Sequence, residues 1–202
     1  MMLPAISSRA LTIRGASIHV LEAGEISAPA ILFLHGASFT AQTWQEISTL
    51  IYLAERGLRA IAIDVPGYGQ SQKINFSREE FLLKLLEALP CDRPILVSPS
   101  MSGGYSLPFI ARYAEKLSGF VAVAPVGITH HQKAIAGISL PVLAIWGSND
   151  RIVPPKYADL LVELFPQGKK VILPNAGHAC YMNATADFHE HLFAFIEDVF
   201  EV

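Results

Sequence analysis

The chain has 202 residues, of which 51% are hydrophobic and 16% are charged, and its formal net charge is −3. This length and hydrophobic content predict one domain, 1–202, with a sizeable core, and the scattered lysines and arginines argue against a nucleic-acid or membrane partner. Only two cysteines, Cys91 and Cys180, are present, and the N-terminus lacks the apolar region of a signal peptide, so we expect a cytoplasmic protein.

Short apolar runs alternate with helical patterns along the chain. A hairpin that turns near Gly15 comes first, before a series of buried strands. We predict these strands at 30–36, 58–69, 93–100, 119–127, 141–147 and 169–175. We predict helices at 41–57, 77–89, 103–117, 155–165 and 184–200.

This alternation predicts the α/β class. Strands separated by helices require right-handed crossovers, which give a mostly parallel sheet with helices on both faces. The segment 128–140 is too short for a second domain, and we expect it to be a loop with solvated His130 and His131. The predicted architecture therefore has no lid domain.

No phosphate-binding loop follows the predicted strands. The first parallel strand ends in HGASFT, and the second ends in GYGQS, which has only two glycines. Neither matches a dinucleotide or Walker A loop. His189 and His191 are two residues apart on a helix and face different ways, so they make a poor metal pair. We therefore expect no metal and no cofactor.

The stretch ILVSPSMSGG, 95–104, carries three serines at alternate positions where an apolar strand meets a glycine pair. A sharp turn from a strand into a helix can lift a serine above the sheet edge, provided that its neighbours two positions away are small. Both Ser100 and Ser102 meet this condition. Either of them could therefore be the nucleophile.

Pro99 favours Ser100. Proline lacks an N–H and is poorly placed inside a central strand. If Ser100 is the nucleophile, Pro99 is the last residue of the strand, where the missing donor costs little. If Ser102 is the nucleophile, the strand has to continue through Pro99. We predict Ser100 and keep Ser102 as the alternative.

A serine nucleophile needs a base, and the base needs an orienting acid. Asp150 follows the strand VLAIWG, and His178 follows the strand KKVILPN. Open parallel sheets carry their sites at these strand ends. Three residues in this order, each just past a strand, predict a triad in which His178 takes the proton of Ser100 and Asp150 orients the imidazole.

A tetrahedral intermediate needs two N–H donors for its oxyanion, each worth about 3 kcal/mol. We expect one donor to be the backbone N–H of Met101, the residue after the nucleophile. The second is expected from Ala37, with Ser38 as the alternative, because Gly36 lets that backbone come close. His35 is expected to hold this loop beside the site.

Five stretches together resemble the α/β-hydrolase superfamily: FLHGASFTAQTW, IDVPGYGQS, LVSPSMSGG, WGSNDRIVP and NAGHACY. They cover the chain from about residue 11 onwards. The stretch SPSMSGGYSLPF is also similar to the serine-rich elbow of the α/β-hydrolase domain-containing protein 14 group, and this similarity supports Ser100. The resemblance implies a fold without a lid.

Without a lid, loops must form the substrate pocket. The candidates for its lining are Ser38, Phe39, Trp44, Met101, Tyr105 and Tyr181. Ordinary core packing is an equally good explanation for Trp44, which lies on a predicted helix. An open, shallow site favours small acyl groups, or a large partner that presents one.

The resemblance implies a serine hydrolase of esterase or deacylase type that acts on a small acyl substrate or an acylated protein. A transferase that passes the acyl group to coenzyme A is a second hypothesis, since one member of the group is described in that way. A binding module without catalysis is a third. The presence of all three triad residues argues against the third, and the sequence leaves the substrate and the oligomeric state open.

Overall fold

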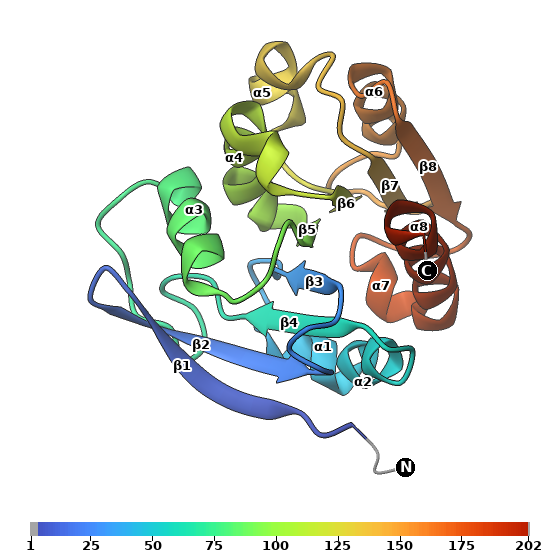
Figure 1. The fold of residues 1–202 in the computed structure, drawn as a ribbon. Helices are drawn as coiled ribbons and strands as arrows, with labels where there is room; N and C mark the ends of the chain where they lie inside the picture. Colours follow the sequence, from blue (N-terminus) through green and yellow to red (C-terminus); the bar gives the residue numbers. More distant parts are fainter. Residues whose placement is uncertain (1–3, 202) are drawn as a thin grey trace.

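An eight-stranded sheet runs through the middle of the molecule in the order β1-β2-β4-β3-β5-β6-β7-β8 (Figure 1). The computed structural model of the chain describes residues 4–201. The strands are β1 (Ser7–Ile13), β2 (Ala16–Ala23), β3 (Ala30–Phe33), β4 (Arg59–Ile63), β5 (Ile95–Pro99), β6 (Gly119–Val123), β7 (Val142–Gly147) and β8 (Gly168–Leu173).

The hairpin β1–β2 is antiparallel, and β2 pairs antiparallel with β4, whereas all pairs from β4 to β8 are parallel. The predicted hairpin turn forms at Arg14 and Gly15, which both have positive φ, as tight hairpin turns require. The registers align the carboxyl ends of the parallel strands along one edge. Pro99 lies opposite Val123, for example, and Gly147 lies opposite Leu173.

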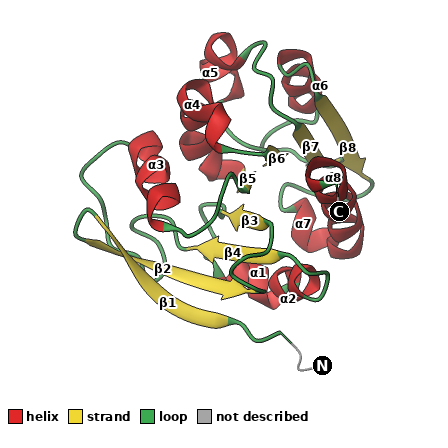
Figure 2. Cartoon of the chain, in the orientation of Figure 1, coloured by secondary structure: helices red, strands yellow, loops and turns green. Residues whose placement is uncertain are grey.

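Two layers of helices cover the sheet, one on each face (Figures 1 and 2). One layer packs its apolar side chains into the same core cluster and contains α3 (Arg78–Ala88), α4 (Gly103–Tyr113), α5 (Ile128–Ile135) and α6 (Lys156–Leu164). The other layer contains α1 (Gln42–Glu46), α2 (Thr49–Ala54), α7 (Cys180–Asn183) and α8 (Thr185–Phe200). The predicted α/β architecture is confirmed.

Local sequence explains why these elements form where they do. Strands β3 to β7 are buried along their whole length, as expected for uninterrupted apolar runs between two helix layers. Helix α3 begins after Ser77, whose hydroxyl accepts a hydrogen bond of 3.2 Å from the N–H of Glu80. Glu79 and Glu80 in its first turn complement the helix dipole.

Two predicted segments differ from the structure. The predicted helix 41–57 is divided into α1 and α2, because Ser48 between them adopts a left-handed conformation with φ of 61°. The segment 128–140 is not a plain loop, since α5 includes His130 and His131. Helix α5 packs beside α4 and α6.

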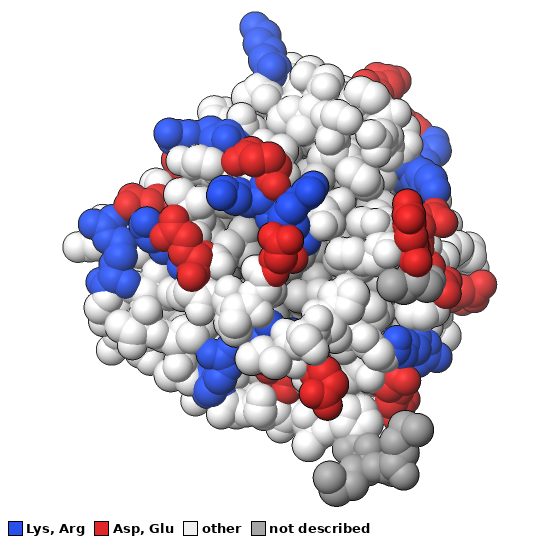
Figure 3. Space-filling model, in the orientation of Figure 1, with Lys and Arg blue, Asp and Glu red and all other residues white. Residues whose placement is uncertain are grey.

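Charged side chains of both signs are interspersed over the face drawn in Figure 3, without a continuous patch of either sign. This distribution agrees with the scattered charges of the sequence. Among the helices of residues 4–201, none is long and apolar enough to cross a membrane.

Candidate active site

Ser100 lies at a sharp turn between β5 and α4. Strand β5 ends at Pro99, as predicted, and a short 3₁₀ turn at Ser100–Ser102 leads into the helix. Ser100 has a φ of 49°, a left-handed backbone conformation that is uncommon for a residue other than glycine. This backbone places the Ser100 hydroxyl at the carboxyl edge of the sheet.

The other two serines of the stretch are buried and bonded inside the fold. The hydroxyl of Ser98 lies 2.8 Å from the hydroxyl of Ser106. The hydroxyl of Ser102 donates to the carbonyl of His35 and has no exposed surface. Ser100 is therefore the serine that this turn presents to its surroundings.

Backbone segments approach each other closely around the turn. The N–H of Val126, just past β6, donates to the carbonyl of Ser100 at 2.9 Å. A side chain at Gly103 would collide with the carbonyl of Val126, so only glycine fits where α4 packs against this loop. The loop after β3 also passes close to this turn, since a Cβ added at Gly36 would lie 3.7 Å from Ser100 Cβ.

The structure brings Ser100, His178 and Asp150 together in one chain of hydrogen bonds. His178 Nε2 lies 2.7 Å from Ser100 Oγ, and His178 Nδ1 lies 2.8 Å from Asp150 Oδ2. The Asp150 side chain is fully buried, whereas the His178 side chain is 18% exposed. The imidazole therefore bridges a buried carboxylate and a serine hydroxyl at the surface.

Backbone contacts hold the carboxylate and the imidazole in place. Oδ1 of Asp150 accepts two hydrogen bonds, of 2.8 Å from the N–H of Ile152 and 2.9 Å from the N–H of Val153. These bonds leave Oδ2 free to accept from His178 Nδ1. A side chain at Gly147 would collide with the carbonyls that precede His178, so glycine allows the loops after β7 and β8 to touch.

His35 fixes the loop that contains Ala37. Its Nδ1 lies 2.8 Å from the carbonyl of Gly36, and its Nε2 accepts a 3.0 Å hydrogen bond from the N–H of Val65. Burial lowers the pKa of His35, so the neutral ring, which can both donate and accept, is favoured. His35 thereby links the loop after β3 to the loop after β4, in keeping with the expectation that it holds this loop.

The predicted oxyanion donors stay a prediction, and their positions are compatible with it. Ala37 and Ser38 are exposed at the mouth of the site. The N–H of Met101 lies in the first turn of a 3₁₀ helix, where backbone donors have no partner within the helix.

The expected aromatic lining needs correction. Trp44, Tyr105 and Tyr181 are 0%, 4% and 2% exposed, so they do not face a substrate. Trp44 donates from its indole N–H to the carbonyl of Leu34 at 2.8 Å and stacks on Tyr181 at 4.9 Å. Burial also raises the pKa of Tyr181. These rings support the site from the core, and only Phe39, which is half-buried, keeps an exposed edge.

The side chains beside the site include a buried thiol. Cys180 follows His178 by two residues, has no exposed surface and is a free cysteine. Burial raises the pKa of its thiol to about 12. Within residues 4–201, the histidines, cysteines, aspartates and glutamates form no group of three or more that could hold a metal ion.

Val126 and Ile152 were not predicted from the sequence, although both lie beside the triad. Val126 is 40% exposed and Ile152 is 69% exposed, which is unusual for large apolar side chains. Each follows the carboxyl end of a parallel strand, β6 or β7. Their position just past a strand end could have identified them, because open parallel sheets bind ligands at that edge.

A second chain of hydrogen bonds with the same residue types lies elsewhere. His19 on β2 has its Nε2 3.0 Å from Ser8 Oγ on β1 and its Nδ1 2.9 Å from Asp64 Oδ2. Asp64 also accepts from the N–H of Ala41 at 2.7 Å and from the N–H of Gln70 at 2.8 Å. This second cluster joins the hairpin to the loops that follow β3 and β4.

Sequence comparisons identify the family of the chain. A model of the Alpha/beta hydrolase family matches residues 31–140, and a model of the alpha/beta hydrolase fold matches residues 126–185. Protein ABHD14A of Danio rerio is 42% identical over 174 residues, 82% of this chain, which spans 63% of that relative. "Putative protein-lysine deacylase ABHD14B" of Homo sapiens is 35% identical over 175 residues, 83% of this chain and 82% of the relative.

Solved structures share the fold at lower sequence identity. The predicted CIB-like hydrolase of Thermoplasma acidophilum superposes with a TM-score of 0.92 at 22% identity, covering 96% of this chain and 99% of that one. The epoxide hydrolase VrEH1 of Vigna radiata gives a TM-score of 0.81 at 16% identity, covering 96% and 98%. The family model and the ABHD14 relatives together show that the chain belongs to the alpha/beta hydrolase family.

Proposed function

We propose that the chain is a serine hydrolase that cleaves short acyl esters or amides through an acyl-enzyme on Ser100. The observation that carries the proposal is the continuous path from Ser100 Oγ through both nitrogens of His178 to Asp150 Oδ2, with distances of 2.7 and 2.8 Å. Such an arrangement activates a hydroxyl that is otherwise a weak nucleophile.

The reaction has two halves. In the first, Ser100 Oγ attacks the acyl carbon while its proton moves to His178 Nε2, and Asp150 stabilises the imidazolium. The bond to the leaving alcohol or amine then breaks as His178 returns the proton to it. In the second half, water attacks the ester of Ser100 in the same way, which releases the acid and restores the serine.

The N–H groups of Met101 and Ala37 are the proposed oxyanion donors. Loss of one such donor costs about 3 kcal/mol of transition-state stabilisation in enzymes of this kind. The positive φ of Ser100 supports this assignment. In a turn of this kind, the N–H of the next residue, Met101, can face the reacting carbonyl.

Acylated lysine side chains on proteins are the substrates that we favour. The name of the ABHD14B relative describes a protein-lysine deacylase. Helix α5, which lies in the β6–β7 crossover, packs beside α4 and α6, and Ala37 and Ser38 are exposed. A site without a cover suits a group presented on the surface of a large partner.

A fluorophosphonate probe tests the proposed nucleophile. Intact mass measured after brief exposure should show one adduct on the wild type and on Ser102→Ala, and none on Ser100→Ala. Ser102→Ala is the matched control, because it changes the neighbouring serine of the same turn. Labelling lost only in Ser102→Ala contradicts the assignment of Ser100, and an unlabelled wild type favours a binding module.

Product analysis then separates the two acceptors. An acetylated peptide is incubated with the enzyme, with and without coenzyme A, and the products are identified by mass. Acetate in both reactions indicates a hydrolase. Acetyl-coenzyme A formed at the expense of acetate indicates that a thiol intercepts the acyl-enzyme.

A further inference from the structure

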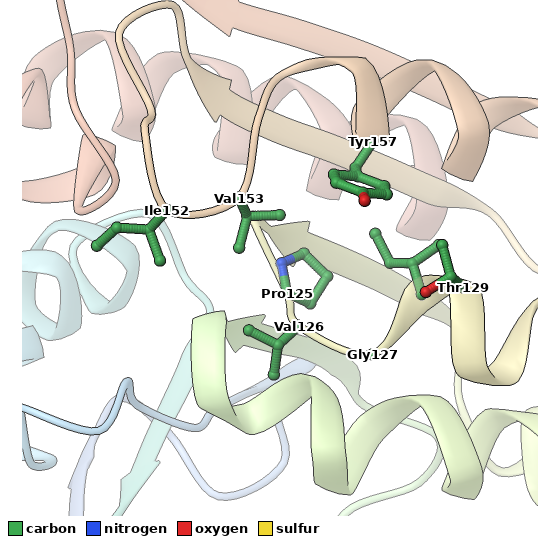
Figure 4. Close-up of a pocket in the computed structure, with 8 residues that line it drawn as sticks. Pro125, Val126, Gly127, Thr129, Ile152, Val153 and Tyr157 are labelled. Atoms are coloured by element: carbon green, nitrogen blue, oxygen red, sulfur yellow. The ribbon is translucent and has the colours of Figure 1, made fainter.

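A cavity of about 160 Å³ opens beside the triad, over the carboxyl ends of β6 and β7 (Figure 4). Its walls come from the loop after β6, the loop after β7 and the first turns of α5 and α6. Pro125 and Val126 form one side, and Ile152 and Val153 form the other. Figure 4 shows Pro125, Val126 and Val153 between Ile152 at one end and Tyr157 and Thr129 at the other.

The walls of this cavity are bonded directly to two members of the triad. Val126 donates its N–H to the carbonyl of Ser100 at 2.9 Å. Ile152 and Val153 donate their N–H groups to Asp150 Oδ1 at 2.8 and 2.9 Å. The same backbone bonds that position Ser100 and the Asp150 carboxylate therefore also position the walls of the cavity.

The lining of the cavity is uncharged and combines apolar side chains with polar backbone and hydroxyl groups. Every lining residue among 4–201 is neutral, and the exposed fractions of 40% for Val126 and 69% for Ile152 leave apolar surface available at its entrance. Cavities of about 150 Å³ hold a molecule of about six carbon atoms, such as benzene. The hydroxyls of Tyr157 and Thr129 lie at the end far from Ile152 (Figure 4) and limit the length of an apolar chain.

We propose that this cavity binds the acyl chain of the substrate and that it selects uncharged acyl groups of up to about six carbons. This inference rests on the proposed function, since it names the part of the substrate that remains on Ser100. A hexanoyl group places five carbons beyond its carbonyl, which this volume accepts, whereas an octanoyl group places seven there.

The position of His178 indicates that the acyl chain, and not the leaving group, occupies the cavity. His178 must hand its proton to the leaving atom, so the leaving group lies on the His178 side of the carbonyl. His178 comes from the loop after β8, which continues into α7 on one face of the sheet. The cavity is bounded by α5 and α6, which cover the opposite face.

The test measures kcat/KM for p-nitrophenyl esters with acyl groups of two, four, six and eight carbons. For the wild type, kcat/KM should rise severalfold per added methylene up to four to six carbons, as apolar surface is buried, and should fall at eight. Thr129→Trp and Val126→Trp should lower the ratio of hexanoyl to acetyl kcat/KM at least tenfold. Tyr157→Ala, which extends the cavity, should raise the octanoyl value.

Ile26→Trp is the matched control. Ile26 is a 62% exposed apolar residue between β2 and β3, before the amino end of β3, whereas the cavity lies at the carboxyl ends of the strands. It should leave the acyl profile as in the wild type. Labelling of Ser100 by the fluorophosphonate probe, measured in every variant, reports on the triad separately. If the cavity variants are labelled but keep the wild-type acyl profile, the cavity assignment alone is overturned. If the wild type shows neither labelling nor turnover, the proposed function and this inference are overturned together.

A series of acetate esters with leaving alcohols of one to six carbons completes the test. The three cavity variants should change the acyl series and leave the alcohol series nearly unchanged. The reverse result assigns the cavity to the leaving group and overturns the proposal.

Discussion

Two regions of this molecule carry the same order of hydrogen bonds, from a serine hydroxyl to an imidazole and from the imidazole to a carboxylate. In the first region, Ser100 and Asp150 lie 2.7 and 2.8 Å from the nitrogens of His178. In the second, Ser8 and Asp64 lie 3.0 and 2.9 Å from the nitrogens of His19. Side-chain distances alone do not separate them.

The backbone around each serine separates the two regions. Ser100 has a positive φ, begins a 3₁₀ turn and lies beside a cavity. Ser8 lies inside the antiparallel edge strand β1, directly opposite Leu21 in the register. A regular strand offers no turn of free N–H groups where an oxyanion would form.

The carboxylates of Asp64 and Asp150 also differ in the hydrogen bonds that they accept. Asp64 accepts hydrogen bonds from Ala41 and Gln70, and a side chain at Gly69 would collide with it, so several loops depend on this residue. Within residues 4–201, the backbone donors to the Asp150 carboxylate are Ile152 and Val153, which also line the cavity. Under the proposed function, the backbone setting of Ser100 is what suits a serine to be a nucleophile, while the same side-chain contacts at Ser8 join the hairpin to neighbouring loops.

The largest expected difference is between the two serines. Ser100→Ala should lower kcat/KM for p-nitrophenyl butyrate by about 10⁶-fold, because loss of a triad nucleophile removes nearly all of the triad's contribution. Ser8→Ala should stay within about twofold of the wild type, since it removes one exposed hydroxyl. Steady-state kinetics of the two variants decide this, and a large loss in Ser8→Ala would show that the second cluster contributes to catalysis.

The two carboxylates should differ in kind of effect. Asp150→Asn should lower kcat by about 10⁴-fold, because an amide favours the wrong imidazole tautomer. Asp64→Asn should keep kcat within about fivefold and lower the free energy of unfolding by about 2–3 kcal/mol, because a buried acceptor of several hydrogen bonds is lost. Kinetics and urea unfolding of both variants check this, and equal losses of kcat would remove the distinction.

A third hydroxyl–imidazole contact lacks a carboxylate and sharpens the comparison. His189 Nε2 lies 2.9 Å from Thr49 Oγ1, and burial lowers the pKa of His189 to about 4. In the unfolded chain the histidine gains its proton near pH 6.5, whereas in the folded protein it stays neutral down to about pH 4. The contribution of neutral His189 to the free energy of unfolding is therefore fully present above pH 6.5 and is lost as the pH falls towards 4. The loss should reach about 3 kcal/mol near pH 4.

His189→Gln isolates this contribution in urea unfolding at pH 7.5 and pH 4.5. The variant should lose less stability between these two values than the wild type does. His191→Gln, two residues along the same helix and less buried, is the matched control and should behave as the wild type does. The same pH dependence in all three proteins would show that His189 is not the group that titrates.

The smallest expected effect concerns the serine that the sequence left as the alternative nucleophile. Ser102→Ala removes the hydrogen bond to the carbonyl of His35 and should cost about 1 kcal/mol of stability. Esterase kcat/KM should change by less than about tenfold, since His35 keeps its bonds to Gly36 and Val65. Thermal unfolding and the same ester assay measure both quantities.

The sequence predicted the parts of the site that depend on local rules. Proline at position 99 cannot continue a central strand, so the end of β5 and the choice of Ser100 followed from the chemistry of one residue. The loops of Asp150 and His178 could be placed because parallel strands align their carboxyl ends. The fold class followed from the alternation of strands and helices.

Features that depend on tertiary packing could not be predicted. The helical periodicity of 41–57 continues through Ser48, so the pattern gives no sign of the left-handed backbone at this residue. Apolar character alone does not tell a cavity wall from the core, so Trp44 and Tyr181 were assigned to the pocket while Val126 and Ile152 were missed. The second cluster joins residues that are up to 56 positions apart and belong to no single motif.

The buried thiol of Cys180 has a consequence for how the protein responds to oxidants. Peroxides and alkylating reagents attack thiolates, and a thiol without exposed surface whose pKa is about 12 holds almost no thiolate at neutral pH. Cys91 is half-buried, and burial raises the pKa of its thiol as well. The hydrolysis proposed at Ser100 should therefore continue under peroxide stress that disables enzymes with a cysteine nucleophile.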